Sequence, residues 1–386
     1  MAKPQASPAF PALGPTSPLV PPLYQSSVYT LPDLDALDQV MNAEEPGFIY
    51  ARDNHPNARH LADQLTRLEG GSWGLVCASG MSAITAPVLA LVQQGDRIVA
   101  SNRLYGRTTQ FFTQELVRFG VQTTYVDAGD LDQVRAALER PAKLLFVETM
   151  SNPLLRVPDV PRLAKLAQER GCPLFVDNTF ATPVLARPLE WGADLVMESL
   201  TKMIGGHSDI TLGVVCGGGD LLQQVSQVVS IWGLACNPFD CWLATRGLAT
   251  LPLRMRAACA NAAALADWLA EQPGVSRVVY PGRTDHPDHE LARRLFAGHF
   301  GNMLCVELAG GRDAVNAFLR LAKGVPFSPS LGNTTTTCSH PGSTSHRYTS
   351  PAEKRRQGIS DGLLRVSVGV EEIDDIQAEF AKGLRV

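Results

Sequence analysis

The sequence predicts an α/β protein, with a large domain built on a mostly parallel sheet and a smaller α+β domain after it. Two observations indicate this. Between about residues 60 and 250, short apolar runs without polar alternation alternate with amphipathic helical stretches, as in a parallel sheet covered on both faces. Beyond about residue 250, an Ala-rich helix precedes a mixture of strands and helices, which is typical of a separate α+β unit.

The expected elements follow in order along the chain. We expect strands of the large sheet at residues 75–77, 97–100, 144–147, 174–176 and 194–197. A helix is expected over Pro161 to Arg170, where Leu163, Leu166 and Ala167 share a face and Gly171 ends it. In the second unit we expect helices at 257–269, 313–321 and 374–384, and strands at 275–280, 302–308 and 364–368. The predicted division is an arm at 1–55, a large domain at 56–250 and a C-terminal domain at 251–386.

Length and charge narrow the function classes. The 386 residues, 45% of them hydrophobic, are enough for a large buried core. The net charge of −4 gives no basic surplus for nucleic acid and no charge block for an anionic membrane. The apolar runs are shorter than the roughly 20 residues that span a bilayer. The Pro-, Ala- and Ser-rich segment 1–20 lacks the pattern of a secretory signal, so we expect a cytoplasmic protein without nucleic-acid or membrane partners.

Eight cysteines raise the question of a metal or disulfide framework. They show no C-x-x-C pair and no regular spacing, and most lie in apolar runs. We therefore expect buried free thiols and no metal. A metal site built on Cys338, His340 and His346 is the alternative.

Lys202 is the first candidate for chemistry. It follows the expected strand 194–197, and open α/β sheets place ligands at the carboxyl ends of their strands. The hydroxyls of Ser199 and Thr201 flank it and are suited to phosphate oxygens. Taken alone, a lysine on a glycine-rich loop is more often a solvated charge.

Two further motifs lie at strand ends. Asp177 ends the strand 174–176, where a carboxylate can bond a protonated ring nitrogen, although it could equally cap a turn. Ser79, Gly80 and Met81 stand between a strand and a helix, whose free N–H groups attract anions. An amine, an acid and a phosphate cup within one α/β domain are what the cofactor pyridoxal 5'-phosphate (PLP) requires.

Several motifs in register point to a known family. They are Ser199-x-Thr201-Lys202 with Gly206-His207-Ser208-Asp209, Val176-Asp177-Asn178-Thr179, Glu148-Thr149-x-Ser151-Asn152-Pro153, Tyr105-Gly106, Arg246-Gly247-Leu248, and Arg365-Val366-Ser367-Val368-Gly369 followed by Glu371. From about Pro21 to the C-terminus the chain resembles the Cys/Met-metabolism PLP-dependent enzymes, the trans-sulfuration family of cystathionine lyases and synthases and methionine γ-lyase.

The resemblance implies a fold and a cofactor site. The fold would be the type I, aspartate-aminotransferase-like fold of PLP-dependent transferases. Lys202 would carry PLP as a Schiff base, Asp177 would hold the pyridine nitrogen and Asn152 would contact the ring hydroxyl. Tyr105 would stack on the ring and act as an acid/base near the leaving group. The phosphate would be held by the small residues and hydroxyls already noted, namely Ser79, Gly80, Met81, Ser199 and Thr201.

The resemblance also implies an assembly. Tyr50 and Arg52 would reach the phosphate of a neighbouring subunit, so the site would need a homo-oligomer, usually a dimer of dimers. Arg365, aided by Ser330 and Leu331, would clamp the α-carboxylate of a small amino-acid substrate.

The implied reaction begins when Lys202 removes the Cα proton of a sulfur amino acid or activated homoserine. Loss of the Cγ substituent then leads to elimination or to replacement by a thiol, with a cystathionine γ-lyase or γ-synthase type preferred. A β-lyase, a methionine γ-lyase or an O-acylhomoserine sulfhydrylase stays open. The alternative from another class is a PLP-fold binding protein without activity, against which the complete cofactor set argues.

Four departures from the family pattern are expected to lie at the substrate side chain. His55-Pro56-Asn57 replaces Asn-Pro-Thr, Met203 replaces the tyrosine after the lysine, Arg107 replaces a glycine, and Thr335 replaces a glutamate. Arg107 lies two residues after the ring tyrosine. It suggests a substrate with an anionic or zwitterionic side-chain end, unless it points to solvent or pairs with a local acid.

Overall fold

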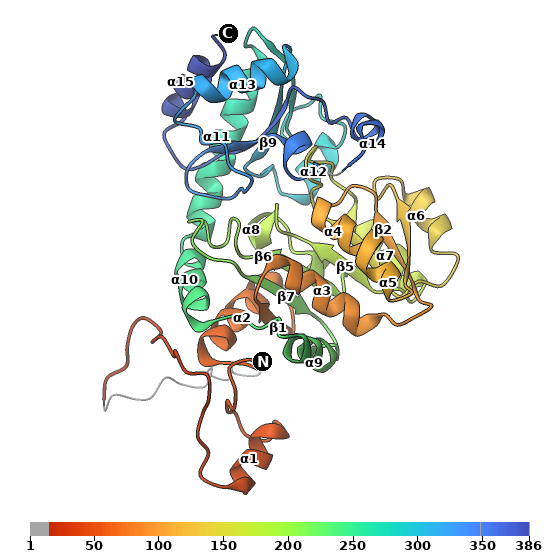
Figure 1. Cartoon of the computed structure of the whole chain (residues 1–386), viewed down its shortest axis with the longest axis vertical. Coiled ribbons are helices and arrows are strands. Elements are labelled where there is room, and N and C mark those ends of the chain that lie inside the picture. Colours follow the sequence, from red (N-terminus) through yellow and green to blue (C-terminus); the bar gives the residue numbers. More distant parts are fainter. Residues whose placement is uncertain (1–14, 348, 386) are drawn as a thin grey trace.

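The structure is a computed structural model that describes residues 15–347 and 349–385 (Figure 1). Residues 1–14 lie outside the described residues. They are the first part of the predicted arm and most of the segment 1–20, which lacks the pattern of a secretory signal. The larger sheet has seven strands: β1 (Trp73–Cys77), β2 (Arg97–Ser101), β3 (Gln122–Val126), β4 (Leu145–Glu148), β5 (Leu174–Asp177), β6 (Leu195–Ser199) and β7 (Gly213–Gly217). Every predicted strand of this sheet is present, which confirms the reading of the apolar runs.

The order of strands is β1-β7-β6-β5-β4-β2-β3. The five strands from β6 to β3 run parallel, and β7 and β1 are antiparallel to their neighbours. The predicted mostly parallel sheet is thus confirmed. Because β4, β5 and β6 are neighbours, the residues that follow them meet at one edge.

Helices cover this sheet on both faces and are also found outside it. Before and around the sheet they are α1 (Leu34–Met41), α2 (Pro56–Glu69), α3 (Gly80–Leu91), α4 (Gly106–Gln110), the π-helix η1 (Phe111–Glu115), α5 (Leu116–Arg118), α6 (Leu131–Ala137), α7 (Val160–Glu169), α8 (Thr182–Leu185), the 3₁₀-helix η2 (Pro188–Trp191), α9 (Leu222–Trp232) and α10 (Pro238–Leu248). After the sheet follow α11 (Leu251–Ala270), α12 (His289–Leu295), α13 (Gly311–Leu321), the 3₁₀-helix η3 (Pro341–Ser343), α14 (Pro351–Arg356) and α15 (Ile373–Gly383).

Strand β5 shows why the apolar runs lack polar alternation. Its Leu174 and Val176 pack on one face of the sheet with residues of α7, while Phe175 packs on the other. There the Phe175 ring meets Phe146 edge-on at 5.1 Å between ring centroids, and Phe146 meets Phe112 in the same way at 5.3 Å. Each such pair adds about 0.5–1.5 kcal/mol beyond burial. Both faces of the strand are therefore core.

A second, antiparallel sheet has the order β10-β11-β9-β8, with β8 (Val275–Val279), β9 (Met303–Leu308), β10 (Thr337–Ser339) and β11 (Leu363–Ser367). Helix α11 lies between the two sheets in sequence and runs vertically down the upper left of the molecule, toward α10 (Figure 1). Its first half packs in the core beside the large sheet through Leu251 and Met255, and its second half packs in the core of the small sheet through Leu265 and Leu269. The helix begins six residues before the predicted residue 257, because Pro252 suits its first turn.

The segment before α2 extends away from the body, with α1 apart from both sheets (Figure 1). No residue of α1 is buried, and Leu34 and Met41 expose most of their surface. The segment is tied down at its base, where Asn57 bonds the Tyr24 N–H and the Pro22 carbonyl, each at 2.9 Å. The described helices include none long and apolar enough to cross a membrane.

All eight cysteines are free, and seven are buried, which confirms the expectation of buried thiols for those seven. Cys236 is partly exposed. His340, from the alternative metal reading, lies with Nδ1 at 2.8 Å from the Ser343 hydroxyl and Nε2 at 3.0 Å from the Asp361 carbonyl.

Candidate active site

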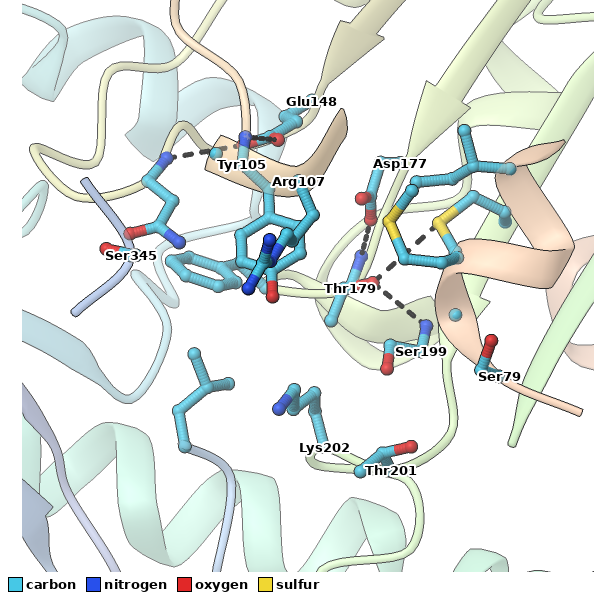
Figure 2. Close-up of a pocket in the computed structure, with 18 of the residues that line it drawn as sticks. Ser79, Tyr105, Arg107, Glu148, Asp177, Thr179, Ser199, Thr201, Lys202 and Ser345 are labelled. Atoms are coloured by element: carbon cyan, nitrogen blue, oxygen red, sulfur yellow. Dashed lines mark hydrogen bonds between the residues drawn. The ribbon is translucent and has the colours of Figure 1, made fainter. Parts of the chain in front are cut away.

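A cavity of about 450 Å³ lies where β4, β5 and β6 end. Its volume is within the range of cofactor and ligand sites. Lys202 enters it from one side, Asp177 and Glu148 from the opposite side, and Ser79 and Ser199 from a third (Figure 2). The predicted residues that line it are Ser79, Gly80, Met81, Tyr105, Arg107, Asn152, Asp177, Ser199, Thr201, Lys202, Leu331 and Arg365.

Lys202 lies in the turn after β6, and its Nζ donates to the Ser330 hydroxyl at 2.9 Å. Burial and the nearby Arg365 guanidinium lower the pKa of Lys202 to about 8. The loop of Ser330 can approach because residue 332 is glycine: a Cβ at Gly332 would lie 2.5 Å from the backbone nitrogen of Met203. The amine is therefore held in the cavity with a substantial neutral fraction near neutral pH.

Arg365 comes from β11 in the small sheet and is buried. Its guanidinium donates to the Asn152 side-chain oxygen at 3.0 Å and to the Ser330 carbonyl at 3.3 Å. Its Nε has no hydrogen-bond partner, and no ion pair of Arg365 occurs, among the described residues. A buried guanidinium with a spare donor and no counter-charge is suited to bind an anion such as a carboxylate.

Glu148, which is buried, and Asp177, which is partly buried, lie opposite each other on adjacent parallel strands. Asp177 accepts from the Thr179 N–H at 3.0 Å. Glu148 accepts from the N–H groups of Tyr105 at 2.5 Å and Asn152 at 3.2 Å. Burial raises the pKa of both carboxyl groups, and the charge of Asp177 raises that of Glu148 further. A cationic ring nitrogen beside Asp177 would offset the cost of that buried charge, so the site fits a protonated pyridine.

Glu148 was missed as a site residue in the sequence, although it belongs to one of the motifs. Its two hydrogen bonds fix the backbone of Tyr105 and Asn152, which both line the cavity. The available signal was its place at the end of an expected strand, next to the strand that ends in Asp177.

The N-terminus of α3 forms the third wall. Ser79 caps this 12-residue helix by accepting from the Ser82 N–H at 3.0 Å. Gly80 lies so near β6 that a Cβ on it would be 2.8 Å from the Ser199 Cβ. The Ser199 N–H in turn donates to the Thr179 hydroxyl at 2.9 Å. A helix N-terminus beside small hydroxyl residues fits a phosphate group.

Tyr105 and Arg107 stand at the start of α4, and both line the cavity (Figure 2). Arg107 donates to the Gln110 side-chain oxygen at 2.8 Å, one turn further along. The expectation that all four departures lie at the substrate side chain is wrong, because Arg107 alone among them lines this cavity of the described chain. Met203 packs into the core beneath the turn, His55 is buried at the start of α2, and Thr335 does not line the cavity.

Tyr50 and Arg52 do not line the cavity of their own chain. Tyr50 pairs with Val28 in an isolated bridge, and the Arg52 guanidinium lies 5.2 Å from the centroid of the Tyr50 ring. Tyr50 exposes 43% of its surface. The role of this pair at a neighbouring subunit's phosphate stays a prediction.

These features together narrow the class of protein. A lysine with a lowered pKa can bind an aldehyde, the buried acid can hold a pyridine nitrogen, and the arginine can hold an amino-acid carboxylate. PLP-dependent enzymes are the class that needs all three in one cavity. The chain belongs to the family of Cys/Met metabolism PLP-dependent enzymes, whose sequence profile matches residues 12–385.

Individual relatives agree with this assignment. The chain is 43% identical over 341 residues to an O-succinylhomoserine sulfhydrylase of Pseudomonas aeruginosa, covering 88% of this chain and 84% of the relative. It is 38% identical over 369 residues to an L-methionine gamma-lyase of Pseudomonas putida, with 95% and 92% covered. Among solved structures, cystathionine gamma synthase of Xanthomonas oryzae pv. oryzae, in complex with aminoacrylate and cysteine, superposes with a TM-score of 0.90 at 35% identity. The match covers 95% of this chain and 92% of that one.

Proposed function

We propose that the chain catalyses γ-replacement in trans-sulfuration, with O-succinylhomoserine as the activated homoserine and a thiol as the incoming group. The proposal is supported by two cationic side chains, Arg365 and Arg107. Both line the cavity that Lys202 also lines. A substrate with a carboxylate at each end matches them. The name of the Pseudomonas aeruginosa relative points to the same substrate class.

The cofactor contacts follow from the walls of the cavity. Lys202 would hold the aldehyde carbon of PLP, Asp177 would keep its ring nitrogen protonated, and Asn152 would contact its ring hydroxyl. The N-terminus of α3 and the residues of that wall, Ser79, Gly80, Met81, Ser199 and Thr201, would hold the phosphate. When bound, PLP stabilises the negative charge that develops at the substrate Cα.

The protein's own groups then orient the substrate and move protons. Arg365, with Ser330 and Leu331, holds the α-carboxylate, and this fixes the Cα proton relative to Lys202. The Lys202 amine takes that proton and the Cβ proton, for which its lowered pKa of about 8 suits it. Tyr105, at the mouth, gives a proton to the group that leaves Cγ. Arg107 binds the distal carboxylate of the leaving succinyl group.

The first test measures kcat/KM for O-succinylhomoserine with a thiol, for cystathionine and for methionine. In Arg107→Ala we expect a roughly 10- to 100-fold loss for O-succinylhomoserine, the usual cost of losing a hydrogen bond to a charged group. Methionine, whose side chain ends in a methyl group, should change little. Arg118→Ala, which removes an exposed arginine of α5, is the control. An equal loss for all three substrates contradicts the assignment of Arg107.

The second test separates an enzyme from an inactive binding protein of the same fold. The purified protein should show the visible absorbance of lysine-bound PLP and should release thioether product from the substrates above. Lys202→Ala should lose both, while Lys165→Ala, on the exposed face of α7, should lose neither. A cofactor-loaded protein without product from any substrate of the panel contradicts the proposed activity.

We also propose a homo-oligomer, a dimer of dimers, in which Tyr50 and Arg52 bind the phosphate in a neighbouring subunit. The exposed apolar side chains of α1 and of the segments beside it support the proposal, because another subunit could cover them. The cytoplasmic location stays a prediction.

A further inference from the structure

Cys236 differs from the other cysteines, all of which lie in the described part of the chain. The others are buried, whereas Cys236 is partly exposed and borders a small hollow beside residues 51–55. Its Sγ lies 3.5 Å from the Sγ of Cys241 and 3.7 Å from the Nε2 of His55. When protonated, the Cys236 thiol can donate to the Val76 carbonyl at 3.7 Å. Two thiols and an imidazole therefore meet at one point, where Cys236 is partly exposed and the other two residues are buried.

The helix cap of α2 fixes which nitrogen of His55 carries the proton. His55 is the N-cap of α2, and its Nδ1 accepts from the Ala58 N–H at 3.1 Å. Because Nδ1 must keep its lone pair for that bond, the proton of the neutral ring lies on Nε2. Nε2–H then points to Cys236 as a donor, and Cys241 donates to the same sulfur.

These two donors favour the thiolate of Cys236. The hydrogen bond from Cys241 and the His55 ring lower the pKa of Cys236 to about 6 against the effect of burial. The same contact with Cys236, together with burial, raises the pKa of Cys241. One sulfur is thus prepared as a nucleophile and its neighbour is kept as a thiol, which is the usual division of a redox-active pair.

The same three residues could be read as metal ligands, since their ligand atoms lie within 4.8 Å of one another. A metal would need the lone pair of Nε2, which would move the ring proton to Nδ1. That proton would oppose the Ala58 N–H, and the helix would lose its cap. The geometry therefore favours thiol chemistry over metal binding.

The start of helix α10 brings the two thiols close to each other. Asn237 caps this helix by accepting from the Asp240 N–H at 2.8 Å, so Cys236 precedes the cap and Cys241 is the fourth helical residue. Side chains at these two positions commonly pack together and fix the entry of the chain into a helix. A disulfide needs the sulfurs at about 2.05 Å. The two sulfurs, now 3.5 Å apart, must therefore move closer for the bond to form.

We propose that Cys236 and Cys241 are a modification site, at which a hydroperoxide converts the two thiols to an intramolecular disulfide. The Cys236 sulfur attacks one peroxide oxygen, the O–O bond breaks, and Cys236 becomes a sulfenic acid while the other oxygen leaves as water or alcohol. The Cys241 sulfur then attacks Cys236, the S–S bond forms, the S–O bond breaks, and the oxygen leaves as water with the Cys241 proton. Two electrons pass from the thiols to the peroxide. A dithiol reductant reverses the reaction by exchange.

The disulfide would act on the loop that carries Tyr50 and Arg52. Oxidation takes the sulfur partner from His55, whose backbone N–H bonds the Asn54 side chain at 2.8 Å. Asp53 is held on the other side by the Ser230 hydroxyl at 2.5 Å. We therefore expect oxidation to loosen PLP retention in the neighbouring subunit. This consequence rests on the proposed role of Tyr50 and Arg52, whereas the disulfide itself does not.

The experiment treats the holoenzyme with hydrogen peroxide, alkylates the remaining thiols and maps them by mass spectrometry. We expect the loss of two alkylatable thiols, a cross-linked peptide joining Cys236 and Cys241, and recovery of both thiols with dithiothreitol. Cys241→Ser should stop at the sulfenic acid or its further oxidation products. Cys338→Ser, which removes a buried thiol on β10, should form the same disulfide as the wild type. In His55→Asn, where Asn keeps the helix cap, the pH of half-maximal alkylation of Cys236 should shift upward.

Two results would overturn the proposal. In the first, Cys236 and Cys241 of the wild type stay alkylatable after peroxide at doses that oxidise exposed methionines. In the second, the wild-type protein is purified with a bound zinc ion, and the Cys236→Ser variant, also not treated with peroxide, lacks that ion. Thiol mapping of the wild-type protein requires no enzyme activity and no variant. A negative result there is therefore distinct from a failure of the proposed reaction. If the disulfide forms without any change in PLP retention, only the proposed coupling to the loop is contradicted, and the disulfide proposal stands.

Discussion

Lys202 and Arg365 bring two cationic groups into one cavity. Each charge disfavours the other, and burial disfavours both. Lysine yields first because an arginine guanidinium keeps its proton at any ordinary pH. The arrangement therefore converts an ordinary lysine into a base that works near neutral pH and keeps a permanent cation beside it for the substrate carboxylate.

This pairing predicts the reactivity of the lysine in cofactor-free protein. Trinitrobenzenesulfonate should modify Lys202 with a midpoint near pH 8, well below the value of an exposed lysine. Because burial is the larger cause, Arg365→Met should raise the midpoint only in part. The modified peptides are quantified by mass spectrometry across pH, with Lys165 as the exposed reference. A shared midpoint for both lysines contradicts the account.

Asp177 predicts a conflict between stability and activity. Burial raises its folded-state pKa, so the carboxylate form lowers stability above its unfolded pKa, and this cost grows until the pH passes the raised value. Asp177→Asn removes the charge and should raise the Tm of cofactor-free protein at pH 8. Activity should fall roughly 100-fold, because the ring nitrogen loses its counter-charge. Calorimetry and kcat measure the two effects, and a lower Tm in the variant contradicts the first.

The sequence was sufficient to place Lys202, Asp177 and the Ser79 turn together, because strand ends of a parallel sheet meet at one edge. It was not sufficient to predict the direction in which each side chain of a turn points. Met203 follows Lys202 directly, yet it points into the core, since successive residues of a turn face different sides. The group of His55, Cys236 and Cys241 joins residues almost two hundred positions apart, which spacing alone cannot reveal.

At the scale of elements, the site depends on close approaches that glycines permit. The loop after Ser330 passes over the turn of Lys202, and Gly332 there has φ +82°. Sequence patterns predicted the strands and helices that flank this loop, with α11 beginning earlier than expected. They did not predict the approach, because it joins a loop of the small-sheet region to a turn of the large sheet.

Substitution of Gly332 tests this contact. Gly332→Ala adds a Cβ at 2.5 Å from the Met203 nitrogen, in addition to a left-handed backbone conformation. Gly219→Ala shares that backbone conformation, at φ +65°, but has open space around it. We expect about 1–2 kcal/mol of lost stability for Gly219→Ala and at least twice that for Gly332→Ala. Denaturant titration measures both, and equal losses contradict the steric argument.

At the scale of the whole molecule, the proposed phosphate contact of Arg52 would link cofactor binding to the assembly of subunits. The phosphate wall of the cavity has a helix N-terminus and hydroxyl groups, and the predicted phosphate-binding cation Arg52 does not line the cavity of its own chain. The loop of Arg52 follows a segment with exposed Leu34 and Met41, which are suited to lie against another chain. Oligomer formation and cofactor binding should therefore depend on each other.

A mixed oligomer tests that dependence. Arg52→Ala and Lys202→Ala, each expressed alone, should have little activity, because one lacks the phosphate contact and the other lacks the base. When both are co-expressed with different tags and the mixed species is purified, a neighbour's intact Arg52 can serve a cavity with intact Lys202. In each catalytic pair that has one chain of each variant, this combination occurs at one of the two sites, so a pair of this kind should regain about half of the wild-type activity. Tetramers built from one dimer of each variant have no such pair and lower the yield. The variants mixed after purification, without subunit exchange, provide the background. If Arg52 served only its own chain, every site of the mixed species would lack one group, and activity would not exceed that background.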